Sequence, residues 1–152
     1  MILPKDFINE INISQNLFGL DFGDKTIGLA ISDKSKKIAL PLFTILRKSV
    51  EKDIKKLENL INEYDIGGIV MGLPLNLDGN ENKNTKKIRD FASKMEKLLN
   101  IKITFYDERF STDVIFKDLK KNAISKKKIS KNIDNFAAAY ILQGFLDNLN
   151  VD

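Results

Sequence analysis

Acidic residues at three places in the chain could act together in metal-dependent chemistry. Asp21 directly follows an apolar run, and Asp107 and Glu108 end a later one. Asp134 stands at the start of the apolar C-terminal segment. Carboxylates held close together repel one another unless protons or cations bridge them, and Mg²⁺ or Mn²⁺ suits oxygen ligands. Each acid alone is typical of a solvated strand end or helix start, but their coincidence favours a divalent-metal site.

The amino-acid composition narrows the chemistry further. The 152 residues include no cysteine and no histidine. Their absence excludes disulfides, thiolate or imidazole zinc sites and a Ser-His-Asp triad. An enzyme with this sequence must use carboxylates, Lys, Tyr, Ser or Thr, or a hard metal ion. The net charge of +4 mildly favours a polyanionic partner.

The elements that must position these acids can be predicted from hydrophobic periodicity. Three closely spaced strands are followed by alternating helices and strands, which predicts an α/β domain with a mixed five-stranded sheet. Three of its strands are antiparallel, two continue in parallel, and helices flank the sheet. We expect one domain over residues 1–152, with residues 1–16 as a short extension of one helical turn. The expected strands are 17–22, 27–32, 37–46, 66–72 and 101–106, and the expected helices are 49–64, 84–99, one from Ser111, and 133–149.

The predicted topology brings the acids to one edge of the sheet. If the first and last strands are parallel, Asp21 and the acids after Tyr106 lie at the same carboxyl edge, where α/β sheets tend to bind ligands. Side chains alternate along a strand, so Glu108 shares a face with Tyr106 while Asp107 faces the other way. The sequence alone does not choose between these two acids.

Four segments resemble the motifs of the YqgF/RuvX family, in the family's order and over nearly the whole chain. They are LDFGDKTIG at 20–28, GLPLNLDG at 72–79, DERFST at 107–112 and IDNFAA at 133–138. This resemblance implies an RNase H-like fold and a metal-dependent nuclease, named in the family for precursor 16S rRNA or for Holliday junctions. It also implies Asp21, Glu108 and Asp134 as the catalytic, metal-binding acids, with Asp107 in reserve. Thr26 departs from the family pattern, which has a basic residue there.

Polar and basic residues near the acids are candidates for contacts with substrate phosphates. Each has a plainer interpretation as a solvated charge or turn residue, and the basic run at 117–131 is equally typical of a solubilising mobile loop. The predicted substrate-binding residues are Lys25, Asn76, Arg109, Lys126, Lys127 and Lys128.

The function predicted from these features is hydrolysis of a phosphodiester with two Mg²⁺ or Mn²⁺ ions. The leading hypothesis is processing of the 5' end of precursor 16S rRNA, and the alternative is resolution of branched DNA, which requires a dimer. Monomer and homodimer both stay open. Lower-ranked alternatives are a nucleotide-binding module, because Asp21, Gly23 and Gly28 also fit the first phosphate motif of actin-like folds, and a non-catalytic nucleic-acid-binding module.

The sequence also predicts where the protein works. No apolar run approaches the roughly 20 residues needed to cross a bilayer. Residues 1–15 lack the basic and apolar regions of a signal peptide. We therefore expect a cytoplasmic protein without a membrane partner.

Overall fold

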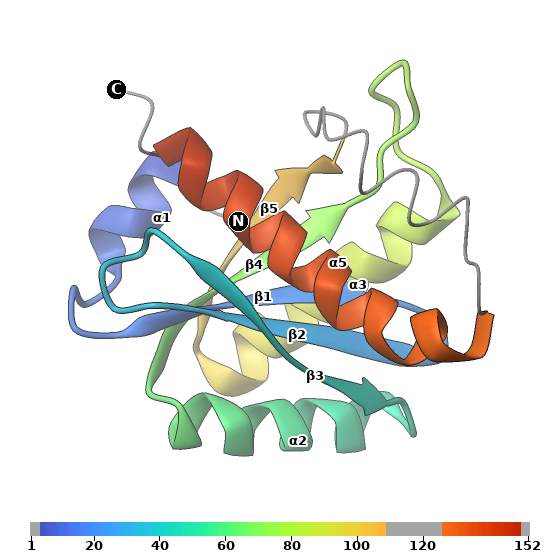
Figure 1. Ribbon diagram of the computed structural model, residues 1–152, viewed down its shortest axis with the longest axis horizontal. Coiled ribbons are helices and arrows are strands. Elements are labelled where there is room, and N and C mark those ends of the chain that lie inside the picture. The colour runs from blue at the N-terminus through green and yellow to red at the C-terminus, as the bar shows by residue number, and fades with distance from the viewer. Residues whose placement is uncertain (1–3, 109–125, 150–152) are drawn as a thin grey trace.

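The computed structural model describes residues 4–108 and 126–149, with backbone alone for Pro4 and residues 126–135 (Figure 1). Among these residues, no helix combines the length and apolar character needed to span a membrane. The elements, in chain order, are α1 (Pro4–Glu10), β1 (Asn16–Phe22), β2 (Thr26–Ser32), β3 (Ala39–Leu46), α2 (Val50–Glu63), β4 (Ile66–Leu73), α3 (Lys83–Leu99), β5 (Lys102–Asp107) and α5 (Lys126–Leu149).

The five strands form one mixed sheet in the order β3-β2-β1-β4-β5. β1 pairs with β2, and β2 with β3, in antiparallel register. β4 runs parallel to both β1 and β5. The predicted mixed sheet is therefore confirmed, and the first and last strands are parallel as the convergence of the acids requires.

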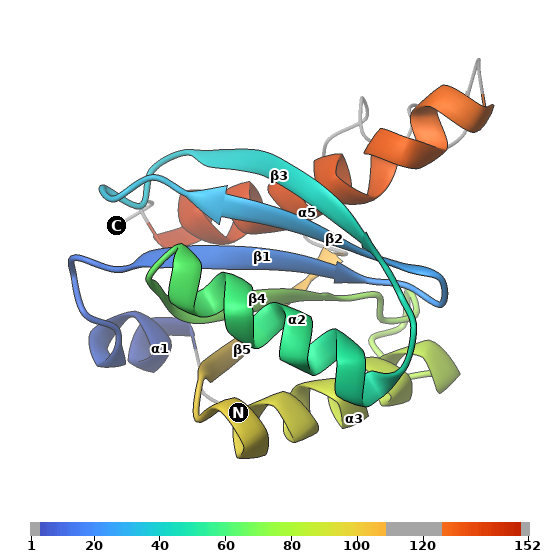
Figure 2. The same ribbon diagram turned by 90° about the horizontal axis from the view of Figure 1, so that it is seen from below.

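Helices cover both faces of the sheet, with α5 on one face and α2 and α3 on the other (Figure 2). The central strands are buried on both sides, which explains their nearly continuous apolar sequences. Phe18 and Leu20 of β1 enter the core beneath α2 and α3. Leu17 and Val70 enter a second core, which α5 and α1 cover.

The N-terminal segment is more structured than the sequence predicted. Instead of a single turn it forms the seven-residue helix α1. Phe7 of this helix is fully buried, and its ring meets that of Phe145 edge-on at 5.7 Å. The ring also lies against Gly68, where a Cβ would come within 2.6 Å of it. One buried aromatic residue in so short a segment gives no readable period.

Helices α2 and α3 begin where polar caps stand in the sequence. The Ser49 side chain accepts a hydrogen bond from the Lys52 backbone N–H and so caps the N-terminus of α2. Asn82 caps α3 in a reciprocal capping box with Thr85. The predicted start of this helix at residue 84 is therefore nearly right.

The start of helix α5 corrects the sequence prediction. The helix begins at Lys126, not at residue 133, so Lys126, Lys127 and Lys128 belong to a helix instead of a loop. Asp134 consequently lies beyond the first two turns and does not open the helix. Lysine is a good helix former and no Gly or Pro interrupts residues 126–133, so the helix continues beyond its apolar part. The helix predicted from Ser111 lies outside the described residues.

Helix α5 lies directly on strand β1 because Gly19 has no side chain. A Cβ at Gly19 would lie 2.7 Å from the Ala138 carbonyl oxygen and 2.8 Å from the Leu142 Cβ. Gln143 also fixes the helix to β3: its Oε1 accepts a hydrogen bond from the Ala39 N–H, 2.9 Å away. The same side chain donates to the Lys37 carbonyl. The helix therefore has a defined position over the sheet.

Gly19→Ala should lower the free energy of unfolding by about 1–3 kcal/mol, because the new methyl group would push against the α5 backbone. Urea denaturation followed by circular dichroism measures this change. Gly67→Ala is the matched control, since its methyl group would meet only side-chain atoms of Ile11 and Gln15 and no backbone atom of another element. Equal destabilisation by both substitutions would contradict this account.

Candidate active site

Asp21 lies at the end of β1 on the face of the sheet that α5 covers. Leu17, four residues earlier, belongs to the core beneath α5, and Gly19 contacts that helix. Alternation along the strand puts Asp21 on the same face, while Leu20 and Phe22 face the other core. Asp21 is partly buried.

Glu108, not Asp107, shares this face with Asp21. Tyr106 enters the core beneath α5, whereas Phe105 packs against the opposite core. A Cβ at Gly72 would lie 2.5 Å from the Glu108 Oε1, so the carboxylate of Glu108 lies over β4. By alternation, Asp107 points towards the side of α2 and α3. Of the two acids, Glu108 is therefore the one that lies on the same face of the sheet as Asp21.

Gly72 lies between the two acids and provides space for one of them. Leu20 pairs with Met71, so Asp21 follows at the level of Gly72 on the neighbouring strand. The Ile141 Cδ1 of α5 approaches the same position as closely as Glu108 does. Any side chain at residue 72 would occupy the place of the Glu108 carboxylate. Sequence reasoning gave Gly72 no role, although a glycine inside a strand signals close approach of another group.

Asp134 is described only by its backbone, on α5 and one turn before Ala138. Ala138 is the residue that lies on Gly19, so the helix passes over β1 within one turn of Asp134. Among the described residues, no group of three His, Cys, Asp or Glu side chains is placed to hold a metal ion. Of the three predicted acids, Asp21 and Glu108 are described with their side chains.

The structure describes the side chains of two predicted substrate-binding residues, Lys25 and Asn76. Lys25 is exposed on the β1–β2 turn, directly beyond Asp21. Asn76 is exposed in the β4–α3 loop, where its Oδ1 accepts a hydrogen bond from the Asn82 side chain. Asn82 also donates to the Pro74 carbonyl, so it connects this loop to the start of α3. Arg109 and the side chains of residues 126–128 lie outside the described part.

Arg47 holds the β1–β2 turn, a role that sequence reasoning missed. Its Nη1 donates to the Gly23 carbonyl at 3.1 Å, and its backbone N–H donates to the Lys25 carbonyl at 2.9 Å. The guanidinium also lies 4.3 Å from the centre of the Phe22 ring. Two hydrogen bonds and one cation–π contact from Arg47 therefore hold the turn that follows Asp21 and the end of β1 in place.

The charge of Arg47 is balanced by a buried carboxylate on α2. Its Nε lies 3.2 Å from the Oδ2 of Asp53, whose side chain is only 2% exposed. The other oxygen of Asp53 accepts a hydrogen bond from the Lys48 backbone N–H. An acid in the first turn of a helix is ordinary, and nothing in the local sequence shows that this one is buried.

Tyr106 adds a neutral polar group beneath α5. Burial, more than any nearby charge, raises the pKa of its phenol above the usual value. The hydroxyl therefore stays protonated at physiological pH. It lies against Gly144, where a Cβ would come within 2.6 Å of the hydroxyl oxygen.

Two solved resolvase structures share this arrangement of strands and helices. They are T. thermophilus RuvC with a Holliday junction substrate (10% identity, 90% of this chain, 96% of that chain, TM-score 0.53) and Fowlpox virus resolvase with Holliday junction DNA (12% identity, 90% of this chain, 99% of that chain, TM-score 0.52). At such identities the likeness concerns the fold alone. The fold of this chain is RNase H-like.

The sequence assigns the family within this fold. The model of the RuvX family, described as Holliday junction resolvase, matches residues 15–148, and the chain belongs to this family. Proteins named "Putative pre-16S rRNA nuclease" are similar over most of their length. That of Ruegeria pomeroyi is 47% identical over 133 residues (88% of this chain, 86% of the relative). That of Rhodobacter capsulatus is 44% identical over 151 residues (98% and 95%).

Arg47→Met should lower the free energy of unfolding by about 3 kcal/mol, because it leaves the Asp53 carboxylate buried without its cation. The Arg47→Met/Asp53→Asn double variant should be more stable than Arg47→Met, since no buried charge is left. Lys55→Met is the control: it breaks the exposed Lys55–Glu58 pair, worth well under about 1 kcal/mol. Urea denaturation of wild type, these three variants and the single variant Asp53→Asn checks this. Simple addition of the effects of Arg47→Met and Asp53→Asn in the double variant would refute the coupling.

Proposed function

We propose that this protein is a divalent-metal-dependent nuclease that processes precursor 16S rRNA. The observation that carries the proposal is the placement of Asp21 and Glu108 on one face of the sheet, on either side of Gly72. Nuclease activity is common to the description of the family and to the names of its curated members. Processing of ribosomal RNA implies that the protein works in the cytoplasm. We further propose that the whole chain forms one RNase H-like domain.

The residues at this edge fit a hard divalent cation. The sequence contains neither His nor Cys, so oxygen atoms are the available strong ligands, and these suit Mg²⁺ or Mn²⁺. Gly72 leaves the Glu108 carboxylate a place that a larger residue would fill. We assign metal binding to Asp21, Glu108 and Asp134, which together would hold two ions. Such ions, when bound, supply a nucleophilic water at neutral pH and offset the charge of the leaving oxygen.

The remaining residues of the site bind and position the substrate. Lys25 stands on the turn next to Asp21 and would contact a phosphate near the scissile bond. Arg47 keeps this turn in place through Gly23 and Lys25. Substrate contacts are further assigned to Asn76, Arg109, Lys126, Lys127 and Lys128.

Resolution of Holliday junctions is the second candidate function. It is favoured by the description of the family and by the fold shared with two junction-bound resolvases. Symmetric cleavage of a junction needs two active sites, so this function requires a homodimer, whereas rRNA processing is compatible with a monomer. Precursor rRNA is preferred because the relatives named for it share 39–47% identity with this chain, against 10–12% for the junction-bound structures.

Asp21→Asn and Glu108→Gln should each slow RNA cleavage at least about a hundredfold, because each removes a negative metal ligand. Asp107→Asn is the matched control, and it should keep most of the activity since Asp107 faces the other side of the sheet. Single-turnover cleavage of precursor 16S rRNA in Mg²⁺ measures all three. Loss of activity in Asp107→Asn with an active Glu108→Gln would reverse the assignment.

Metal removal and substrate choice test the reaction itself. EDTA should abolish cleavage of precursor 16S rRNA, and added Mg²⁺ or Mn²⁺ should restore it. A four-way DNA junction should stay uncut under the same conditions. Cleavage that persists in EDTA would refute metal dependence. Cleavage of the junction without cleavage of the RNA would establish the resolvase function instead.

A further inference from the structure

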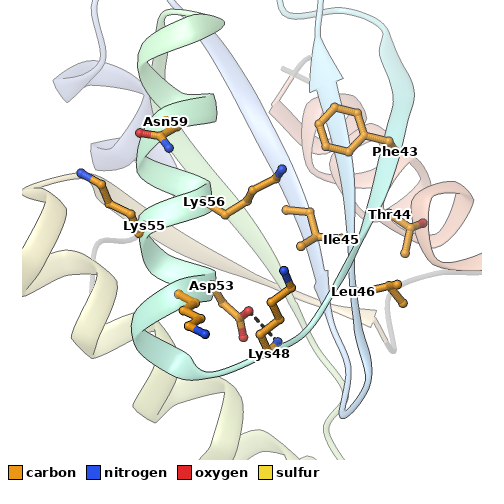
Figure 3. A pocket seen from close by; sticks show the side chains of 10 residues that line it. Phe43, Thr44, Ile45, Leu46, Lys48, Asp53, Lys55, Lys56 and Asn59 are labelled. Carbon is orange, nitrogen blue, oxygen red and sulfur yellow. Dashed lines mark hydrogen bonds between the residues drawn. The ribbon is translucent and has the colours of Figure 1, made fainter.

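A second basic feature lies away from the acids, in the groove between helix α2 and strand β3. This open groove has a volume of about 590 Å³ (Figure 3). Its apolar lining comes from β3, and its cationic lining comes from α2 and from Lys48, two residues before the helix. The lining residues used below are Phe43, Ile45, Leu46, Lys48, Lys52 and Lys56.

The charges of α2 are segregated relative to this groove. The acidic residues Glu51, Glu58 and Glu63 do not line it. Asp53 does, but it is buried and paired with Arg47. Among the described residues, none of Lys48, Lys52 and Lys56 forms an ion pair. The groove therefore presents uncompensated positive charge.

The side chains in Figure 3 show how charge and apolar surface are combined. Lys48 and Lys56 extend into the space between α2 and β3, where Ile45 of the strand forms a buried base that is only 7% exposed. Phe43, earlier in β3, is partly buried, and Leu46, at the end of the strand, is 74% exposed, so these two residues provide the accessible apolar surface. Lysine ammonium groups contact phosphates, and apolar or aromatic side chains contact the faces of unpaired bases. A duplex hides those base faces, so the combination suits a single strand.

The groove opens next to the turn that follows Asp21. Leu46, at the end of β3, pairs with Thr26, and the next residue, Arg47, donates to the Lys25 carbonyl. The β1–β2 turn and the end of β3 lie at the same end of the molecule (Figure 1, Figure 2). A polynucleotide that crosses this turn would pass from the acids over Lys25 to Lys48.

We propose that the groove between α2 and β3 binds a single-stranded segment of the RNA substrate next to the cleavage site. The inference rests on the proposed nuclease function and extends it with a second contact surface. Lys48 and Lys56 bind backbone phosphates, and the apolar lining from β3 contacts bases. The groove thereby holds the substrate while the acids act on a neighbouring phosphodiester.

Binding of a labelled single-stranded RNA from the end of precursor 16S rRNA tests the proposal. Fluorescence anisotropy over a salt series, with EDTA present, separates binding from cleavage. In a plot of log K against log salt, Lys48→Gln/Lys56→Gln should make the negative slope less steep by about 1.4, because two phosphate contacts are lost. If variant and wild type bind equally at 1 M salt, the variant should bind about 25-fold more weakly at 0.1 M.

Lys34→Gln/Lys97→Gln is the matched control, since it removes two exposed charges that do not line the groove. It should bind the RNA as wild type does. If the groove variant and the control variant bind the RNA equally well, the proposal is overturned. An acidic protein would then be the candidate occupant of the groove. The same RNA annealed to its complement should show a much smaller difference between the variants. An equal loss for the duplex would overturn the single-strand assignment.

Cleavage in Mg²⁺, measured separately, distinguishes failure of this proposal from failure of the proposed function. RNA that wild type cuts but that binds equally well to both double variants would refute the groove alone. RNA that binds through the groove yet is never cut by wild type would refute the nuclease function alone.

Discussion

The close approach of helix α5 to the sheet is the constraint on which the rest of the site depends. Gly19 lets the helix backbone lie directly on β1, and Gly72 leaves space on β4 for Ile141 and the Glu108 carboxylate. With side chains at these two glycines, the helix would lie further from the sheet and Glu108 would have to point elsewhere. The same packing that buries the apolar face of α5 therefore orients an acid at the end of β5.

A second constraint is electrostatic. It connects α2, on the face of the sheet opposite α5, to the β1–β2 turn beside Asp21. A carboxylate as buried as that of Asp53 is costly unless a cation and hydrogen bonds compensate it. Arg47 supplies the charge, and this fixes its position between α2 and the β1–β2 turn. The turn beyond Asp21 is consequently held by an interaction that also stabilises the fold.

The sequence predicted the sheet and the starts of α2 and α3, because hydrophobic alternation and capping residues are local signals. It could not choose between Asp107 and Glu108, since that depends on which face α5 covers. It placed the start of α5 seven residues late, because apolar periodicity marks the packed part of a helix and not its exposed beginning. It also missed Arg47, whose pairing with Asp53 depends on the tertiary packing of β3 and α2. The third acid, Asp134, stays a prediction.

The two surfaces proposed to contact nucleic acid lie on different sides of the sheet and meet at the β1–β2 turn. A single strand is flexible enough to cross such an edge, with its phosphates near Lys25 and its unpaired bases in the groove. A four-way junction presents stiff duplex arms, whose stacked bases could not contact the apolar lining at Phe43 and Leu46. The proposed arrangement of charge and apolar surface thus favours a nucleic acid with unpaired ends over a fully paired junction.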